Sequence, residues 1–531
     1  MHKARLVLVL LTLLAVIGIM PLAAQESTEL QFGLSNNIDI LDPNLTTFSS
    51  TGMVMEHVFD PLVWEEPLGT YHPGLATAWS VNEDATEYTF DLRADVTFHD
   101  GTPFNAEAVK FTFDRIANPE TGAQTAFSLL GPYQETEIVD EDTVIVRFSS
   151  PFAPFLNSLA GPYLSISSPT AIEALGADYG QSTVVGTGPF KLDSYIPDSE
   201  IVLVRNDAYA WGSEEIFGIT GPSAFERIVY KIIAEPATRL AALESGEVSF
   251  IDSVPELDVT RLAEDPAFTM VEIEQPGHGW SYMMNAERWP TDQLAVRRAI
   301  SQYINKQGLL DVVYNGFGTP ACSALTKVMF GYDPATCDYL PFDPAAADQT
   351  LTDDGWVKNE TTGYWEKDGE RLALQHYYRA DSPESAAQAT YLQADLSQYG
   401  IQVVLNGLSR AGYFDAVRSG QHNSQGWWDT QTDPDGVFRT LMHSSNADGG
   451  TNRNRYVNPE MDALIDQAAG EADAEARAAL YADIQRLAAD EAVMVYLVDP
   501  YMLYAHTANL SGVAYLAGGN IPNFYGASFG G

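Results

Sequence analysis

Hydrophobic and polar residues change their spacing within the segment 75–118. Apolar and polar residues alternate along Tyr88–Leu92, which predicts a strand with one buried face. The turn-forming run Asp100-Gly101-Thr102-Pro103 follows, and Asn105 then begins a stretch with apolar residues at helical spacing as far as Ile116. The segment therefore predicts an α+β unit, which by itself says nothing about function.

Strand and helix patterns also alternate over the rest of the chain. The expected strands lie at residues 28–34, 200–204, 227–233, 401–405 and 493–498. The expected helices lie at residues 169–175, 292–314, 382–399, 459–469 and 473–490, with a helix followed by a strand at 236–251. Two stretches of alternating strands and helices imply two α/β lobes.

The first 24 residues have the pattern of a secretory signal. Lys3 and Arg5 precede an uncharged apolar run over residues 6–20, and small residues follow as far as Ala24. We expect cleavage after Ala24, because the apolar run is shorter than the about 20 residues that span a bilayer. A retained anchor is the alternative. No cysteine follows the run, so we expect no lipid anchor and a periplasmic or extracellular location.

The chain has two cysteines, Cys322 and Cys337, which export would place in an oxidising compartment. We therefore expect a disulfide that closes the loop around Met329 and Tyr332. A disulfide that closes a loop of this length should raise the free energy of unfolding by about 3 kcal/mol. No further ligands lie near the two cysteines in sequence, so we expect neither a metal site nor a cofactor.

The charge of the chain is strongly negative. Its 531 residues include 28 basic and 72 acidic ones, a net charge of −44, which becomes −46 if Lys3 and Arg5 leave with the signal. Nucleic acid would be repelled, so nucleic-acid binding is excluded. An acidic, solvated surface suited to a salty habitat is favoured over attraction of cationic ligands, because net charge concerns solubility more than site chemistry. With 45% hydrophobic residues the chain can form two or three domains.

The sequence contains none of the common enzyme motifs. It has no Gly-x-Ser-x-Gly, no His-Glu-x-x-His, no P-loop and no dinucleotide-binding glycine motif. The run Asp433-Pro434-Asp435-Gly436 contains a proline and lacks the distal glutamate of a calcium loop, so we interpret it as a turn. No catalytic residue is expected, and a secreted hydrolase is kept only as a distant alternative.

Five segments carry a resemblance to a known family. They are Leu41-Asp42-Pro43, residues 75–118, GTGPFKL at 186–192, VRRAISQYINKQGLLDVVYNGFGTP at 296–320 and GWWDTQTDPDGVF at 426–438. In this order they resemble the family 5 extracellular solute-binding proteins, which include the dipeptide- and oligopeptide-binding proteins of bacterial ABC importers. Together they span nearly the whole mature chain, so chance agreement is an unsatisfactory explanation.

The resemblance implies a two-lobed α/β fold of the periplasmic-binding-protein (Venus flytrap) type with an extra inserted α+β domain. In that family the chain passes from the first lobe into the second and returns. By analogy the signal peptide is 1–24, lobe one is 25–62 with 186–275 and 500–531, the inserted domain is 63–185, and lobe two is 276–499. We expect the lobes to be hinged near residues 186–189 and 275–279.

The segment 426–434 is the main candidate for ligand binding. Neighbouring residues on a strand point to opposite faces, so Trp427 and Trp428 cannot both lie in one core, and one indole is expected to face a cleft. In the peptide-binding members, an aspartate three residues after the first tryptophan binds the ammonium group of the ligand. Here that position is Thr430, and Asp429 precedes it. Either the alignment slips and Asp429 binds the amine, or no free amine is bound in this way.

Other candidate ligand contacts follow from their place in the resembled fold. They are Gln431 beside the aspartate, Phe48, Ser49 and Ser50 in the loop after Leu41-Asp42-Pro43, Trp280 and Tyr282 at the crossing into lobe two, and Arg410 and Tyr413 before the tryptophan segment. Ordinary packing is the alternative for each. Arg410 stands out slightly, because a guanidinium group before the cleft strand could bind a carboxylate through two hydrogen bonds.

The resemblance therefore implies an extracytoplasmic solute-binding subunit of an ABC importer. We expect a monomer that closes by hinge motion on a short peptide and then docks on a membrane permease. Oligosaccharides are the alternative ligand, because sugars stack on indoles and need no ammonium partner. Metal chelates, haem and opines come after them.

Overall fold

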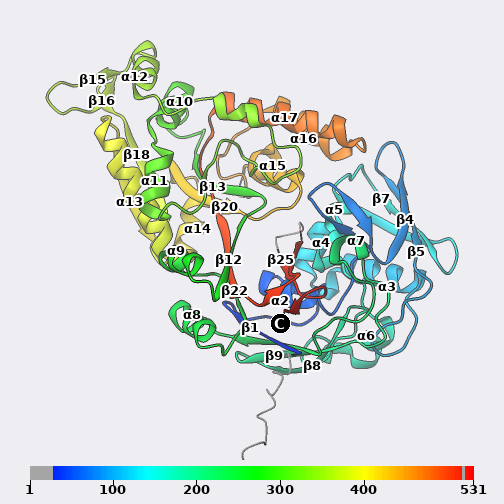
Figure 1. Cartoon of the computed structure of the whole chain (residues 1–531). Coiled ribbons are helices and arrows are strands. Elements are labelled where there is room, and N and C mark those ends of the chain that lie inside the picture. Colours follow the sequence, from blue (N-terminus) through cyan, green and yellow to red (C-terminus); the bar gives the residue numbers. More distant parts are fainter. Residues whose placement is uncertain (1–27, 449, 517–520, 531) are drawn as a thin grey trace, which may run out of the picture.

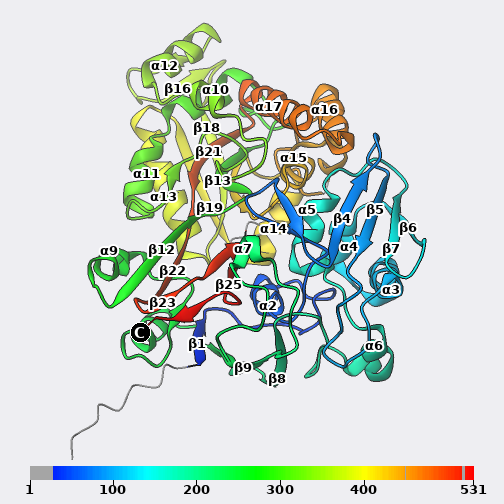
Figure 2. The same cartoon turned by 45° about the vertical axis from the view of Figure 1, so that its right-hand side comes forward.

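The computed structural model describes residues 28–448, 450–516 and 521–530. The predicted signal peptide, residues 1–24, lies outside the described residues. Figures 1 and 2 show one group of helices and strands above, a second group below it, and a smaller sheet with its helices to the right. Within the described part of the chain, no helix is both long and apolar enough to cross a bilayer.

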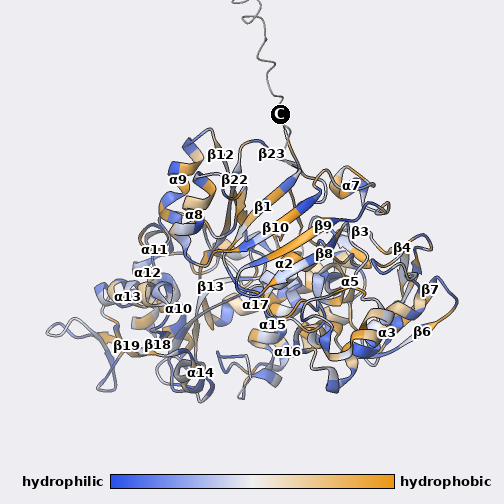
Figure 3. Ribbon diagram, turned by 90° about the horizontal axis from the view of Figure 1, so that it is seen from below, coloured by the Kyte–Doolittle hydropathy of each residue, from blue (hydrophilic) through white to orange (hydrophobic). Residues whose placement is uncertain are grey.

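The lower group is built on a seven-stranded mixed sheet in the order β12-β22-β11-β1-β10-β9-β8. β1 lies parallel to β10 and β11, and the other pairs are antiparallel. The strands are β1 (Glu29–Leu34), β8 (Phe190–Ile196), β9 (Glu200–Arg205), β10 (Arg227–Ile232), β11 (Phe250–Ile251), β12 (Phe268–Glu274) and β22 (Tyr501–Thr507). Figure 3 shows β9 as mostly hydrophobic, as expected for a strand that is covered by other elements.

The upper group is built on a six-stranded sheet in the order β14-β21-β13-β20-β18-β19. Its strands are β13 (His278–Met284), β14 (Thr319–Pro320), β18 (Ala373–Arg379), β19 (Gln402–Leu408), β20 (Ser424–Asp429) and β21 (Met494–Asp499). Side chains of β13 alternate between two cores, because Tyr282 and Met284 pack in one and Met283 packs in the other. The sheet is therefore buried on both faces.

Helices cover both faces of this sheet. The first core is formed with α10 (Leu294–Tyr303), α11 (Lys306–Val313), α12 (Pro344–Asp353) and α13 (Pro383–Gln398). The second core is formed with α15 (Pro434–Met442), α16 (Pro459–Gly470) and α17 (Ala474–Glu491). The expected helical region 292–314 is two helices, because Asn305 interrupts it and caps α11 by accepting a hydrogen bond from the Gly308 N–H.

The smaller sheet on the right has four antiparallel strands in the order β4-β5-β7-β6. They are β4 (Ala76–Val81), β5 (Glu87–Leu92), β6 (Tyr133–Ile138) and β7 (Thr143–Phe148), and the helices beside them are α3 (Ala106–Ala117), α4 (Gln124–Leu130) and α5 (Phe155–Ala160). Tyr88, Phe90 and Leu92 are buried as the alternation predicts. Asn105 caps α3 by accepting from the Ala108 N–H, which confirms the predicted helix start.

The remaining elements are short. The helices are α2 (Ser49–Met55), α6 (Pro169–Leu175), α7 (Glu214–Phe217), α8 (Pro236–Glu244), α9 (Glu256–Glu264) and α14 (Arg410–Arg418). Small sheets are formed by β2 (Val63–Glu65) with β3 (Tyr71–Pro73), by β15 (Val357–Lys358) with β16 (Trp365–Lys367) and β17 (Glu370–Arg371), by β23 (Leu510–Ser511) with β26 (Ser528–Phe529), and by β24 (Ala514–Leu516) with β25 (Ile521–Asn523).

The chain crosses between the two large sheets twice. Residues 275–277 join β12 to β13, and Pro500 joins β21 to β22. The two crossings lie side by side, because the Gln275 N–H donates to the Pro500 carbonyl at 3.0 Å. The predicted crossing at 275–279 is thus confirmed.

The predicted hinge at residues 186–189 is wrong. This segment leads into β8 and packs on residues of the same lobe, where the Gly188 N–H donates to the Val58 carbonyl at 2.9 Å. A Cβ atom on Gly186 would lie 2.1 Å from the Val58 oxygen, so the segment is held closely against its neighbour. The second connection between the large sheets is Pro500.

The predicted disulfide is confirmed. Cys322 and Cys337 are bonded, with their Cα atoms 4.7 Å apart. The loop they close includes the buried Met329, which belongs to the core under α15, α16 and α17.

Candidate functional site

The tryptophan segment lies at the end of β20, close to the crossing between the two large sheets. Trp427 is paired with Ser281 and Asp429 with His278 on β13, so Trp427 and Trp428 point to opposite faces as expected. Trp428 is 40% exposed, and its ring lies 5.9 Å from that of the buried Trp280. Trp428 is therefore the indole with surface available to a ligand.

Trp427 is covered by a cation that we did not predict. The guanidinium carbon of Arg453 lies 3.4 Å from the centre of the Trp427 ring and 5.2 Å from that of Phe414. Such stacking of a guanidinium group on aromatic rings is favourable. The Nη1 atom of Arg453 is buried and makes no hydrogen bond. Burial lowers the pKa of Arg453, which is the expected result of removing a cation from water.

Asp429 lies near this cation and is half-buried. Burial raises the pKa of its carboxyl group, whereas the hydrogen bond from Gln431 and the charge of Arg453 act in the opposite direction. The Gln431 amide donates to the carboxylate at 3.1 Å. Asp429 and Arg453 thus place groups of opposite charge at one end of β20, although they form no direct ion pair.

Thr430 contacts the crossing itself. Its hydroxyl accepts a hydrogen bond from the side-chain amide of Gln275, which lies between β12 and β13. Gly277 allows the two segments to approach, because a Cβ atom there would lie 2.4 Å from the Asp429 carbonyl oxygen. The segment 429–431 is therefore held against the connection between the lobes.

The candidates from the first lobe lie at the start of α2. Phe48 precedes this helix and is 47% exposed, and Ser49 is exposed beside it. Ser50 is buried, and its hydroxyl donates to the Asn37 carbonyl at 2.6 Å. Phe48 and Ser49 thus have free surface, whereas Ser50 is engaged within its own lobe.

Two of the predicted contacts are buried tyrosines. The Tyr282 hydroxyl donates to the Gln388 carbonyl at 2.7 Å, and the Tyr413 hydroxyl donates to the Gly426 carbonyl at 2.9 Å. Arg410 is exposed on α14, where its guanidinium carbon lies 5.9 Å from the Phe414 ring. The Tyr413 side chain thus supports β20 from inside the lobe, whereas that of Tyr282 joins β13 to α13.

Sequence reasoning missed Arg453, Phe414 and Gln275. Arg453 lies in the run Asn452–Tyr456, which contains two arginines. Because basic residues are few in this chain, such a run could have marked Arg453 as a candidate. Nothing local marks Phe414 or Gln275. Among the described residues, no group of three or more histidines, cysteines, aspartates or glutamates is arranged to hold a metal ion.

Comparison with known proteins shows the family. Residues 70–449 match the model of the bacterial extracellular solute-binding proteins, family 5 (middle region). The chain belongs to this family. The matched range includes the whole tryptophan segment, and the predicted fold class and solute-binding role are confirmed. A family 5 protein is a binding protein and not an enzyme, so the distant hydrolase alternative falls away.

Two curated relatives of this family 5 protein share the same percentage of identical residues with it. Heme-binding protein A from Haemophilus influenzae is 29% identical over 485 residues, covering 86% of this chain and 84% of the relative. The dipeptide-binding protein of Escherichia coli is 29% identical over 458 residues, covering 82% and 81%. The structure of HbpA2 from Haemophilus parasuis has a TM-score of 0.83 at 24% identity and covers 94% of this chain and 99% of that one. This last likeness supports the two-lobed fold.

Proposed function

We propose that this protein captures a short peptide between its two lobes and delivers it to the membrane permease of an ABC importer. The observation that carries the proposal is the presence of opposite charges at the end of β20. Asp429 and Arg453 lie on the face of the strand that carries Trp427, and the exposed Trp428 lies on the other face. A short peptide has an ammonium group, a carboxylate and planar amides, which suit a carboxylate, a guanidinium group and an indole.

The two relatives do not indicate which ligand this chain binds, because the proteins named for heme binding and for dipeptide binding are equally similar to it. The choice therefore rests on the site. Thr430 cannot replace the charge of the family's aspartate, and its hydroxyl already accepts from Gln275. We infer that Asp429 binds the ammonium group and that Arg453, with one free buried donor, binds the carboxylate.

The position of the site supports closure of the two lobes on the solute. Residues 429–431 touch the crossing at Gln275, and Phe48 with Ser49 supplies exposed surface on the first lobe. A solute that contacts both lobes favours the closed state, because only contacts that differ between the states shift the population. We assign lobe one to 25–62, 186–275 and 500–531, the inserted domain to 63–185 and lobe two to 276–499. Each of the three larger sheets draws its strands from one of these units.

We also propose that the protein is exported by cleavage after Ala24 and acts as a monomer. Oligosaccharides remain the second candidate ligand. The exposed Trp428 beside Trp280 favours them, because sugars stack on indole faces.

A ligand screen tests the proposal. Unfolding temperatures are measured with dipeptides, longer peptides, oligosaccharides and hemin, since a ligand at 100 times its dissociation constant adds about 2.7 kcal/mol to stability. We expect peptides to raise the unfolding temperature and N-acetylated peptides to do so less. Asp429→Asn should remove this preference for a free amine, because the ammonium group loses its ionic partner. Stabilisation by oligosaccharides or hemin but by no peptide would overturn the peptide assignment.

A further inference from the structure

A cavity of about 320 Å³ lies between the inserted domain and lobe two, and Thr432 and Asp433, which follow the end of β20, belong to its lining. None of the twelve predicted ligand-contact residues lines it. One wall comes from the hairpin β2–β3, strands β4 and β5, and α5, and the other from the loop before α15 and the start of α17. At about 30 Å³ per water molecule in the liquid, the space is large enough for a small organic molecule.

Direct contacts hold the two walls together beside the cavity. The Asn157 amide of α5 donates to the Thr432 carbonyl at 3.2 Å, and the Thr432 hydroxyl donates to the side-chain oxygen of Asn157 at 2.7 Å. The Ala153 N–H donates to the Ala469 carbonyl at 2.7 Å. The cavity is therefore formed by a closed contact between two parts of the chain and opens if they separate.

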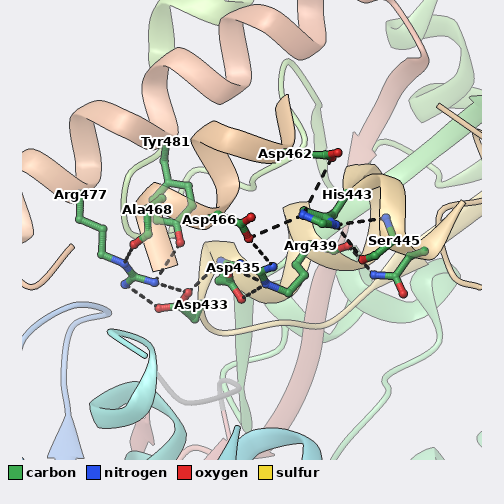
Figure 4. Close-up of polar contacts among 11 residues, drawn as sticks. Asp433, Asp435, Arg439, His443, Ser445, Asp462, Asp466, Ala468, Arg477 and Tyr481 are labelled. Atoms are coloured by element: carbon green, nitrogen blue, oxygen red, sulfur yellow. Dashed lines mark hydrogen bonds and ion pairs between the residues drawn. The ribbon is translucent and has the colours of Figure 1, made fainter. Parts of the chain in front are cut away.

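The donors at the cavity are largely used within the protein. Arg477 donates to both carboxylate oxygens of Asp433, at 2.8 and 2.7 Å, to the Ala468 carbonyl and to the Tyr481 hydroxyl. Figure 4 shows Arg477 reaching from α17 to Asp433 and Ala468. The side-chain amide of Asn157 is also used, because it donates to Glu65 at 2.8 Å and to Thr432. Little donor capacity remains for an anion.

The lining has an excess of negative charge and several aromatic faces. Glu65 is buried, Asp433 is paired with Arg477, and Glu471 lies half-buried beside them, so three carboxyl groups face one guanidinium group. The aromatic side chains are Tyr71, Trp79, Tyr88 and Phe330. Carboxylates and aromatic faces both attract cations.

We propose that this cavity is a second binding site, for a small organic ammonium ion, separate from the solute site at the end of β20. Its ammonium group pairs with Glu65, and its apolar part packs on Trp79 and Phe330. Because both walls contribute, the bound cation favours the state in which the inserted domain contacts lobe two. The site does not depend on which solute the protein carries.

Glu65 makes the site sensitive to pH. The pKa of its carboxyl group is raised to about 7. Burial is the main cause and the charge of Asp433 adds to it, whereas hydrogen bonds from Gly69, Tyr71 and Asn157 act in the opposite direction. Arg477 and Glu471 are the other charged groups that line the cavity. An ammonium ion pairs only with the ionised carboxylate, so its affinity should fall as pH decreases through about 7.

Calorimetric titration of the full-length protein with benzylammonium tests the proposal, with benzoate as the anion of matched shape. We expect benzylammonium to bind at pH 8 and benzoate not to bind. Glu65→Gln should weaken binding at least about tenfold, because a hydrogen-bonded charge pair is lost. Ala474→Phe, which adds a bulky ring at an exposed position of the cavity lining, should abolish binding without altering any polar group.

Two control variants locate the binding. Glu83→Gln removes an exposed carboxylate of the same domain and should leave affinity unchanged. Trp428→Ala alters the solute site and should also leave benzylammonium binding unchanged, which separates failure of this proposal from failure of the peptide assignment. Equal affinity for benzoate, no binding of benzylammonium at millimolar concentration, or full affinity in both Glu65→Gln and Ala474→Phe would overturn the second site.

Discussion

At the scale of single residues, the two neighbouring tryptophans of β20 have different surroundings. Trp427 is half-buried against the core of lobe two and covered by Arg453, whereas Trp428 is 40% exposed beside Trp280. The alternation of a strand predicts this difference, because adjacent side chains point to opposite faces. It does not predict which of the two indoles faces solvent.

Replacing the tryptophans one at a time should separate binding from packing. Trp428→Ala should weaken solute binding by about 2 kcal/mol, because an exposed indole that stacks on a ligand is lost. Its unfolding temperature should change little. Trp427→Ala should lower the unfolding temperature, since the ring that supports Arg453 is removed. Calorimetric titration and thermal unfolding measure the two effects, and equal loss of affinity and stability in both variants would contradict this assignment.

At the scale of elements, the end of β20 is held against the crossing between the large sheets. Gln275 hydrogen-bonds to Pro500 through its backbone and to Thr430 through its side chain. Gly277 has a φ of 114°, a conformation that favours glycine, and lies against the backbone of Asp429 and Gln431. The two crossings and the candidate site thus contact one another directly.

Gly277→Ala should disturb this contact. The new Cβ atom would lie 2.4 Å from the Asp429 oxygen and 2.5 Å from the Gln431 nitrogen, so backbone must move. We expect a loss of about 2 kcal/mol or more of stability and weaker solute binding. Gly221→Ala is the control, because a Cβ atom at that position would have no neighbouring atom within 4 Å. Urea unfolding of both variants measures the difference, and similar free energies would contradict the account.

The disulfide acts at the same scale. It closes the loop between residues 322 and 337, and a loop of this size predicts about 3 kcal/mol of stabilisation. Reduction, or replacement of both cysteines by serine, should therefore lower the unfolding temperature. Differential scanning calorimetry with and without reductant measures this, with the double serine variant as the control for effects of the reductant elsewhere. An unchanged transition would show that the bond does not contribute to stability.

At the scale of the whole molecule, stability depends on keeping several histidines neutral. Burial lowers the pKa of six of them, to about 4 for His57, His99, His278 and His422, to about 3 for His376, and below its ordinary value for His506. The unfolded chain takes up protons at these sites near pH 6.5, and the folded chain does so at the first five only near pH 4 or below. The free energy of unfolding is therefore highest above pH 6.5, where these imidazoles are neutral in both states. It decreases as pH falls from 6.5 towards 4, because only the unfolded chain takes up the protons. Glu65, with its raised pKa, acts in the opposite direction.

His57→Gln should reduce this loss. The His57 Nε2 atom accepts a hydrogen bond from the Phe524 N–H at 3.0 Å, and a glutamine carbonyl oxygen can accept in its place. Between pH 6.5 and 4, the free energy of unfolding of the wild type should fall by up to about 3 kcal/mol more than that of the variant. Urea unfolding at a series of pH values measures both curves. Parallel curves over this range would contradict the assignment of a neutral buried His57.

Local sequence patterns were sufficient to predict many of the elements, and the resemblance of five segments indicated the family of this protein. The strand at 88–92 and the helix capped by Asn105 were predictable because alternation and capping depend on residues that are close in the chain. The packing of the folded chain was needed to show that Pro500 forms the second crossing, that Arg453 covers Trp427, and that Glu65 and Arg477 line one cavity. These features join residues that are far apart in the chain, and no local spacing specifies which distant side chains come together when the sheets pack.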